Sequence, residues 1–460
     1  LYFEPLIEEY VENIILKEKS KGNLLGIIAQ FGGQTPIKLA KFLDENKLPI
    51  LGTQYKSIDL AEDRDRFREL LIKLKLKQAE SGIAYKFDQA IKVAGSIGLP
   101  VVVRPSYVLG GRAMEIVHDK SQLKRFINEA FKVSEQNPIL IDKFIDNAME
   151  VDVDAISDGK DVYVAGIMQH IEEAGIHSGD SACCLPPVSI KSNILKEIKN
   201  QTKKLALALK VKGFLNIQFA IKNDEIYVIE VNPRASRTVP FVSKANGIPL
   251  AKIASRIMSG EKLTKYNLKY KKNKKFAVKE AVFPFNKFPD SDLLLGPEMK
   301  STGEVMGFDD DFGMAVAKSQ IAASNSLPTK GLAFLSVKDS HKQEIVGIAQ
   351  RLIKLGFKLS ATKGTSEVLK QNGMKCKKIN KVSSGRPHIV DILNSKKISL
   401  VINTGGGNTE HRISDARALR RGTLANKIPY CTNMSTAYSF LEAIKSLKTT
   451  KLKVKSLQDN

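Results

Sequence analysis

The stretch GFLNIQFAIKNDEIYVIEVNPRASRTVP, residues 213–240, decides the fold of the chain around it. Apolar residues recur at every second position from Leu215 to Ile221, which is the pattern of a half-buried strand. A short polar turn at 222–225 leads into a second apolar and polar alternation over 226–232. The stretch therefore predicts a β-hairpin.

The returning strand of this hairpin carries candidate metal ligands. Residues two apart on a strand share a face, so Glu230 and Asn232 should point the same way. With the amide of Gln218 they form a set of oxygen donors that suits a hard cation such as Mg²⁺. Arg234 follows, and its guanidinium can clamp a phosphate or carboxylate with two hydrogen bonds. Taken alone, such a face is more often simply solvated.

The composition bounds the class of protein. The 460 residues carry 72 basic and 49 acidic side chains, a formal charge of +23, so nucleic acid is one candidate partner. Lysine is scattered, however, and the dense run at 268–275 lacks interleaved aromatic residues. A solvated, lysine-rich surface and an anionic substrate explain the charge better. Retention on a filter that is weak, non-specific and abolished by salt would dismiss a nucleic-acid-binding module.

Hydropathy and cysteine spacing indicate a cytoplasmic protein. No apolar run approaches the roughly 18 residues of a membrane span, and no signal peptide opens the sequence. Its four cysteines, Cys183, Cys184, Cys376 and Cys431, lack metal-type spacing. We therefore expect a reduced chain without disulfides, a zinc site or membrane contact.

The first half of the chain predicts alternating helices and strands. Before the hairpin we expect helices at about 6–18, 36–46, 57–76, 87–97, 121–134 and 193–210, strands at 24–30, 49–52, 99–119 (with a glycine turn), 138–146 and 149–157, and a last strand that opens the stretch 161–187. The last strand should lead into a long polar loop. An α/β domain of about 55 residues is short, so the chain is expected to begin inside a domain.

The second half changes character after a helix at about 249–259. Residues 261–280 form a basic connector, and residues 281–326 look irregular because of their prolines and glycines. From about 327, strand and helix alternate again, which is typical of a small doubly wound parallel-sheet domain. The tail from about 446 is polar and should be frayed.

A second candidate phosphate site lies upstream, in RPSYVLGGR (104–112). Glycines between two strands let backbone N–H groups approach phosphate oxygens, and Arg104 and Arg112 add charged clamps. A glycine pair in a hairpin is by itself usually a turn. Flanked by arginines and upstream of the oxygen donors, it favours half of a nucleotide-phosphate grip.

Several strings then carry a family resemblance. AEDRDRF, VVVRPSYVLGGRAMEIV, MEVDVDAI, GIHSGDSAC, NIQFA, VIEVNPRASRTVPFVSKA and LLGPEMKSTGEVMG resemble, in this order, the C-terminal half of the carbamoyl phosphate synthetase large subunit. The resemblance implies an α/β and α+β multidomain chain. It would comprise a truncated pre-ATP-grasp α/β domain (1–56), an ATP-grasp domain (57–262), a connector (263–326) and a methylglyoxal-synthase-like regulatory domain (327–460).

The resemblance also implies a site for ATP and Mg²⁺ or Mn²⁺. Gln218, Glu230 and Asn232 would hold the metals, with Gln218 and Glu230 also contacting ATP, and Arg234 would lie beside the acceptor. The remaining contacts implied are Arg64, Arg104, Gly110 and Gly111 at the phosphates, Lys143 and Ile145 at adenine, Glu150 at the ribose, and Gly175, Ile176, His177 and Ser178 closing the pocket. Arg104 and Arg234 would be catalytic.

The implied reaction is phosphorylation of carbamate by ATP to carbamoyl phosphate, feeding pyrimidine and arginine biosynthesis. Its partners would be a homologous N-terminal half and a glutaminase small subunit. Two alternatives stay open. The acceptor could be another carboxylate-like group, although NPRASRTVPFVSKA argues against it, or the fragment could be inactive without its other half.

Two allosteric sites complete the implied picture. Thr362 and Thr365 bracket a strand-to-helix junction suited to an anion, and Lys342, Lys381 and Asn403 match a nucleotide monophosphate site. Gly405 stands where relatives that bind uridylate often have a second threonine, so a purely structural domain is the alternative. Ornithine is the second effector implied, with Glu172, Asp180, Glu280 and Thr432 as its contacts.

Overall fold

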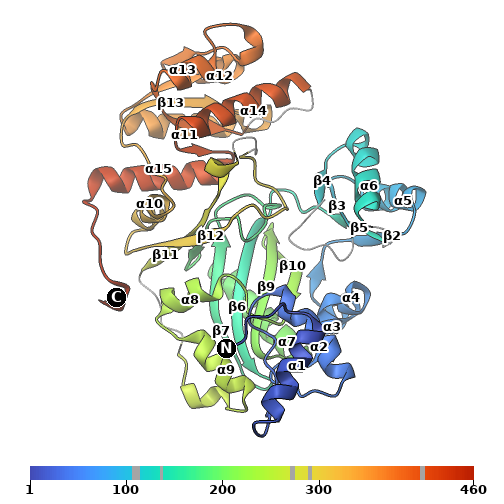
Figure 1. Cartoon of the computed structure of the whole chain (residues 1–460). Coiled ribbons are helices and arrows are strands. Elements are labelled where there is room, and N and C mark those ends of the chain that lie inside the picture. Colours follow the sequence, from blue (N-terminus) through green and yellow to red (C-terminus); the bar gives the residue numbers. More distant parts are fainter. Residues whose placement is uncertain (106–113, 135–137, 270–274, 289–292, 405–409, 460) are drawn as a thin grey trace. The chain divides into compact units, whose positions relative to one another are not determined.

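The computed structural model describes residues 1–105, 114–134, 138–269, 275–288, 293–404 and 410–459 (Figure 1). The chain divides into two compact units. The first contains residues 1–82, 142–169 and 185–273, and the second contains residues 83–141, 170–184 and 274–460.

The first unit begins with two helices, α1 (Glu8–Lys19) and α2 (Gln34–Glu45), close to their predicted ranges. The strands predicted at 24–30 and 49–52 are wrong. Only a single parallel bridge joins Ile27 to Ile50 there, with the N–H of Ile27 donating to Pro49 O at 2.8 Å. Short apolar runs such as these have the composition of strands. They form a regular hydrogen-bonded ladder only when an adjacent strand pairs with them.

The helix predicted at 57–76 is also wrong as one element. It is broken into α3 (Tyr55–Glu62) and α4 (Arg64–Lys73) at Asp63, whose backbone is extended at ψ 114°. The Asp63 carboxylate accepts a hydrogen bond from the N–H of Arg66 at 2.9 Å. An aspartate that caps a helix N-terminus in this way starts a new helix rather than continuing the old one.

The centre of the first unit is a sheet with strand order β1-β10-β9-β6-β7. Valines, leucines and a phenylalanine on one face pack with α7 (Ser192–Ala208) in one apolar core. The predicted hairpin is confirmed as β9 and β10, and α8 (Val239–Asn246) and α9 (Leu250–Met258) follow it (Figure 1). The strands are β1 (Lys77–Gln78), β6 (Met149–Asp158), β7 (Val162–His170), β9 (Lys212–Lys222) and β10 (Glu225–Asn232).

The second unit includes a small four-stranded sheet with order β2-β5-β3-β4. Helices α5 (Phe87–Ile97) and α6 (Lys120–Ser134) pack on it around a separate apolar core. The strands are β2 (Ser81–Ala84), β3 (Val101–Pro105), β4 (Glu115–Val117) and β5 (Ile139–Lys143). The turn between β3 and β4, with Gly110 and Gly111, lies outside the described residues.

Residues 281–326, predicted to be irregular, contain regular structure. β8 (Cys183–Leu185), β11 (Phe276–Val282) and β12 (Gly303–Asp309) are neighbours in a sheet, and α10 (Phe312–Ala322) follows. Two glycines explain the error. A Cβ at Gly307 would overlap the carbonyl of Ala315, and one at Gly313 would overlap the carbonyl of Glu442. Here glycine allows close packing instead of breaking the chain.

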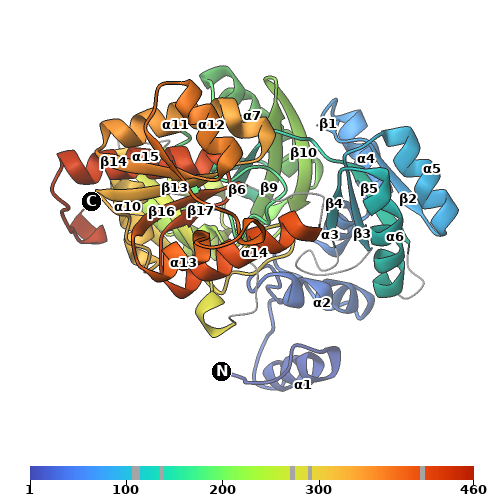
Figure 2. The same ribbon diagram turned by 90° about the horizontal axis from the view of Figure 1, so that it is seen from above.

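The C-terminal domain is the predicted doubly wound parallel sheet, with strand order β15-β14-β13-β16-β17. Helices α10, α11, α12 and α15 share the core on one face, and α13 and α14 cover the other (Figure 2). α15 runs to Thr449, so the tail is ordered beyond the predicted 446. The elements are β13 (Gly331–Ser336), α11 (Lys342–Lys354), β14 (Phe357–Ala361), α12 (Lys363–Gln371), β15 (Cys376–Lys378), α13 (Ile389–Asn394), β16 (Ile398–Asn403), α14 (Glu410–Ala425), β17 (Tyr430–Cys431) and α15 (Met434–Thr449).

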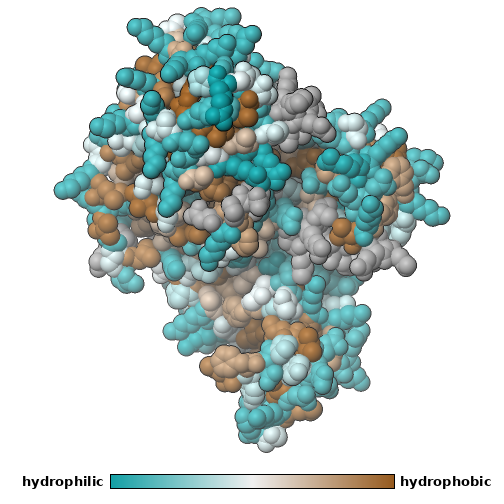
Figure 3. Space-filling view, turned by 45° about the horizontal axis from the view of Figure 1, so that its top comes forward, coloured by the Kyte–Doolittle hydropathy of each residue, from teal (hydrophilic) through white to brown (hydrophobic). Residues whose placement is uncertain are grey.

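Short 3-10 helices complete the description: η1 (Leu263–Tyr266), η2 (Phe285–Lys287), η3 (Asp339–His341), η4 (Val382–Ser384) and η5 (Leu457–Asp459). All four cysteines are buried thiols. Among the described helices, none is long and apolar enough to cross a membrane. Hydrophilic residues cover much of the face drawn in Figure 3, with apolar residues in scattered groups.

Candidate active site and regulatory pocket

The polar face of the first unit's sheet arranges its side chains in two rows. Gln218 lies between Asp152 and Glu230 in the antiparallel register, and Asn216 lies between Asp154 and Asn232. Cross-strand partners share a face, so the predicted alternation is confirmed in the backbone. A β-bulge shifts the register between Val228 and Glu230. Because Glu230 and Asn232 both follow the bulge, they stay in register with Gln218 and Asn216.

The two rows differ in their access to solvent. In the first row Asp152 is buried, Gln218 is half-buried and Glu230 is exposed, whereas all three residues of the second row, Asp154, Asn216 and Asn232, are buried. The opposite face of the same strands belongs to the apolar core. Gln218 and Glu230 in this open row are therefore accessible to a ligand, and Asn232, in the buried row two residues after Glu230, supplies the second amide. Oxygen donors of this kind, one carboxylate and two amides, fit Mg²⁺ or Mn²⁺.

Arg234 lies at the end of this face. Its Nη2 donates to Asn232 Oδ1 at 3.2 Å and its Nη1 donates to Ala235 O at 3.1 Å. Partial burial lowers the pKa of the guanidinium, and the negative charges of Glu230, Glu62 and Asp154 oppose that change. The arginine is thus a fixed cation beside the candidate metal ligands.

Two buried residues of this site escaped sequence reasoning. Asp154 accepts hydrogen bonds from Asn216, Ser236 and Thr238, and burial raises its pKa to about 6. Gln30, from the segment before α2, contacts the chain just after β10. Asp152 and Asp154 share one face of β6 two residues apart, and both are buried.

The remaining predicted residues of the first unit lie on neighbouring elements. Arg64 begins α4, and its Nη1 is 3.4 Å from Asp142 Oδ1 in an ion pair. The N–H of Lys143 donates to Glu80 O at 2.7 Å, so this one backbone group is already used between β2 and β5. Ile145 is half-buried, and Glu150 opens the polar face on β6, opposite Ala220.

Arg104 and residues 175–178 belong to the second unit. Arg104 is half-buried near the end of β3. Gly175 has a positive φ of 94°, and Ile176 is half-buried. The N–H of His177 donates to Gly296 O at 2.8 Å, and its Nδ1 accepts from the N–H of Gly179 at 3.0 Å. Ser178 O accepts from the buried Lys279 Nζ at 3.0 Å.

Acidic residues of the second unit gather near Lys279. Burial raises the pKa values of Glu172 and Glu280, Glu280 to about 8, and each opposes ionisation of the other while Lys279 favours it. Asp180 accepts the N–H groups of Lys300 and Ser301, both at 2.8 Å, so both of its oxygens are engaged by backbone. Thr432 is half-buried just after β17.

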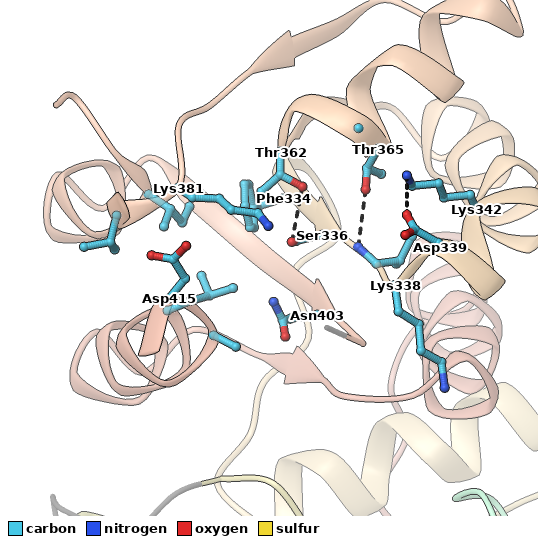
Figure 4. A pocket seen from close by; sticks show the side chains of 16 residues that line it. Phe334, Ser336, Lys338, Asp339, Lys342, Thr362, Thr365, Lys381, Asn403 and Asp415 are labelled. Carbon is cyan, nitrogen blue, oxygen red and sulfur yellow. Dashed lines mark hydrogen bonds and ion pairs between the residues drawn. The ribbon is translucent and has the colours of Figure 1, made fainter. Parts of the chain in front are cut away.

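The C-terminal domain holds a cavity of about 310 Å³ (Figure 4). All five residues predicted for the nucleotide line it: Lys342, Thr362, Thr365, Lys381 and Asn403. Thr362 caps α12, and Thr365 Oγ1 accepts the N–H of Val337 at 3.3 Å. Lys342 pairs with Asp339, and Asn403 Oδ1 is buried without a hydrogen-bond partner among the described residues, which do not include 405–409. Gly405 lies outside the described residues.

Comparison with known proteins matches three family models to this arrangement. They are the carbamoyl phosphate synthase preATP-grasp domain (residues 1–60), the carbamoyl-phosphate synthase L chain ATP binding domain (63–266) and the MGS-like domain (344–432). The chain is 52% identical to the carbamoyl phosphate synthase large chain, C-terminal section, of Aquifex aeolicus, over all of this chain and 88% of that protein.

The chain belongs to the carbamoyl phosphate synthase large-chain family. It is also 52% identical to the large chain of Rhizobium meliloti, over all of this chain but 42% of that protein, so it spans less than half of such a full large chain. The family assignment confirms the ATP-binding, ligase-type chain with an MGS-like domain that the motifs predicted.

Solved structures show the ATP-grasp fold. Biotin carboxylase of Campylobacter jejuni aligns with a TM-score of 0.54 and 16% identity, over 67% of this chain and 76% of that one. The biotin carboxylase domain of Hydrogenobacter thermophilus 2-oxoglutarate carboxylase aligns with a TM-score of 0.54 and 17% identity, over 70% of this chain and 78% of that one. At such low identity, these likenesses establish the fold alone.

Proposed function

We propose that this chain transfers the γ-phosphoryl group of ATP to carbamate, giving carbamoyl phosphate and ADP. It would act as the C-terminal synthetase half of a carbamoyl phosphate synthase in the cytoplasm, supplying pyrimidine and arginine biosynthesis. The observation that supports this most is the open row of oxygen donors, Gln218 beside Glu230, next to the fixed guanidinium of Arg234.

The proposed mechanism depends mainly on positioning and charge. Gln218, Glu230 and Asn232 would hold Mg²⁺ or Mn²⁺, which when bound neutralises phosphate charge. Arg234 would orient the carboxylate-like acceptor, while Arg104 and Arg64 would offset charge on the phosphates as the acceptor oxygen attacks in line. No protein nucleophile is needed. Glu150 would bind the ribose, Lys143 and Ile145 the adenine, and residues 175–178 would exclude water.

The partial back reaction tests this proposal. The chain is incubated with carbamoyl phosphate and MgADP, and ATP is measured with luciferase. We expect ATP from carbamoyl phosphate and little from acetyl phosphate, which has a methyl group in place of the amino group. Equal or greater use of acetyl phosphate would favour a different acceptor, as in other ATP-grasp ligases. If neither carbamoyl phosphate nor acetyl phosphate yields ATP, the result would indicate that the chain needs its N-terminal half and the glutaminase subunit for activity.

A regulatory role for the C-terminal domain is a second proposal. Three lysines, two threonines at the start of α12 and the buried Asn403 Oδ1, which has no partner among the described residues, would form a site for a nucleotide monophosphate. Addition of uridine monophosphate should raise the Tm of the wild type. Lys381→Ala should reduce the shift several-fold, because a cation facing the cavity is lost, whereas Lys378→Ala on exposed β15 should not. No shift in wild type would favour a structural domain.

Ornithine binding is the third part of this proposal. Glu172 and Glu280 are suitable acidic contacts for its ammonium groups, because Glu172 Oε2 is buried and has no hydrogen-bond partner in the described part of the chain. Asp180 is a weaker candidate since two backbone N–H groups already occupy its carboxylate. Thr432 would contact the ligand from the C-terminal domain. Calorimetric titration with ornithine of wild type and Glu280→Gln would test this assignment.

A further inference from the structure

The segment 233–238, which carries Arg234, is held by buried polar groups from two sides. On one side Asp154, 1% exposed, accepts from Ser236 Oγ at 2.8 Å and from Thr238 Oγ1 at 2.6 Å. Asn216 Nδ2 also donates to its Oδ1 at 2.9 Å. The three donors are neutral. A buried carboxylate with neutral partners is costly compared with an apolar side chain, so its presence needs a reason beyond packing.

The second anchor is Gln30, which is also 1% exposed. Its Nε2 donates to Pro233 O at 2.7 Å, and its backbone carbonyl accepts the N–H of Ala235 at 3.0 Å. Its side chain is fixed in turn by Thr53 Oγ1 at 2.7 Å and by the N–H of Phe214 at 3.3 Å. The amide fits there because residue 213 is glycine, since a Cβ at that position would overlap Gln30 Oε1.

Arg234 therefore sits between four anchored neighbours. Residues 233 and 235 are bonded to Gln30, and residues 236 and 238 are bonded to Asp154. Within the part of the chain that the structure describes, the hydrogen bonds of the guanidinium go to local groups, Asn232 Oδ1 and Ala235 O. Its direction is consequently set by the backbone on either side, which the two anchors fix.

We propose that Asp154 and Gln30 are positioning residues that hold the Pro233–Thr238 segment so that Arg234 faces the acceptor. The inference rests on the proposed function, in which Arg234 binds the carboxylate-like substrate. Preorganised charge is worth most when it does not have to reorient during the reaction. Loosening either anchor should weaken binding of carbamoyl phosphate and leave binding of MgADP unaffected, because no adenine or ribose contact proposed above lies in this segment.

Matched variants of the full 460-residue chain test the proposal. Thr238→Val removes one donor to Asp154 at nearly constant volume, and Thr238→Ser restores the hydroxyl. Gln30→Met removes the amide at similar length. Thr202→Val is the control, because this buried threonine donates to Ile198 O within α7, away from the segment. For each variant, the Kd values of carbamoyl phosphate and MgADP are measured by calorimetry, together with KM values in the back reaction.

We expect Thr238→Val and Gln30→Met each to raise the Kd and KM for carbamoyl phosphate about tenfold, as the loss of one buried hydrogen bond predicts, with MgADP values within about twofold. Thr238→Ser should recover most of the affinity, and Thr202→Val should change neither. The double variant should show less than additive loss if both anchors act on the same segment.

Two outcomes would contradict the account at different levels. If wild type binds neither ligand, the proposed function fails. If wild type binds both but the variants bind carbamoyl phosphate as tightly as wild type, or lose both ligands equally, the anchors do not position Arg234 and only this inference fails.

Discussion

At the scale of single residues, the buried carboxyl groups decide how the protein responds to pH. Glu172 and Glu280 bind protons more tightly in the folded chain than in the unfolded one, because burial disfavours their charge. Between about pH 4.5 and about pH 8 the folded state therefore holds more protons than the unfolded state. The contribution of these two residues to the free energy of unfolding is therefore greatest at low pH, and it falls as pH rises through that window.

Glu280→Gln should reduce this pH dependence. The glutamine side chain is neutral and cannot ionise. The variant therefore lacks the carboxyl group whose pKa is raised by burial and by the charge of Glu172. We expect the Tm of wild type to fall more steeply than that of the variant from about pH 5 to about pH 8, measured by circular dichroism. Glu69→Gln, an exposed position on α4, is the control and should follow wild type. Parallel curves for Glu280→Gln and wild type would contradict the assignment.

Single residues also show which parts of the candidate site could not be predicted from the sequence. Glu230, Asn232 and Gln218 were found because alternation on one hairpin fixes which residues share a face. Asp154 and Gln30 were missed because their partners lie 82 and 203 residues away in the chain. No local pattern relates such positions, so only the tertiary fold assigns them a role.

At the scale of elements, close packing of α10 explains where sequence patterns failed. Prolines and glycines in 281–326 suggested irregular structure, yet Gly307 and Gly313 allow α10 to approach β12 and α15. The cap at Asp63 likewise divided a continuous helical pattern. Long periodic elements such as α5, α7 and the β9–β10 hairpin were predicted correctly, because their own apolar spacing determines them.

Gly313→Ala tests this packing. Alanine has the higher helix propensity, by about 1 kcal/mol, but its Cβ would overlap Glu442 O on α15. The overlap should dominate and destabilise the protein by about 1–3 kcal/mol, measured by urea denaturation. Gly95→Ala in α5 is the matched control, because nothing lies within 4 Å of its Cβ position, and it should be neutral or stabilising. Destabilisation of both variants alike would refute the packing explanation.

At the scale of the whole molecule, two kinds of site occur in one chain. An ATP-grasp sheet presents a polar face that carries the candidate metal ligands, and a doubly wound domain presents a cavity of about 310 Å³ whose lining includes three lysines. The family relation joins both to carbamoyl phosphate synthase large chains. Thr362 and Thr365 could be predicted because strand–helix junctions place anion sites at defined points of such a fold, whereas Lys342, Lys381 and Asn403 followed only from the family resemblance.

The most direct test of the central claim compares Glu230→Ala with Glu225→Ala in ATP formation from carbamoyl phosphate and MgADP. Both glutamates lie on β10 and are exposed, but Glu225 pairs with Lys77 at 2.5 Å at the far end of the strand. The account predicts at least a hundredfold loss for Glu230→Ala, about 3 kcal/mol of transition-state stabilisation, and near wild-type activity for Glu225→Ala. Undiminished ATP formation by Glu230→Ala would contradict it.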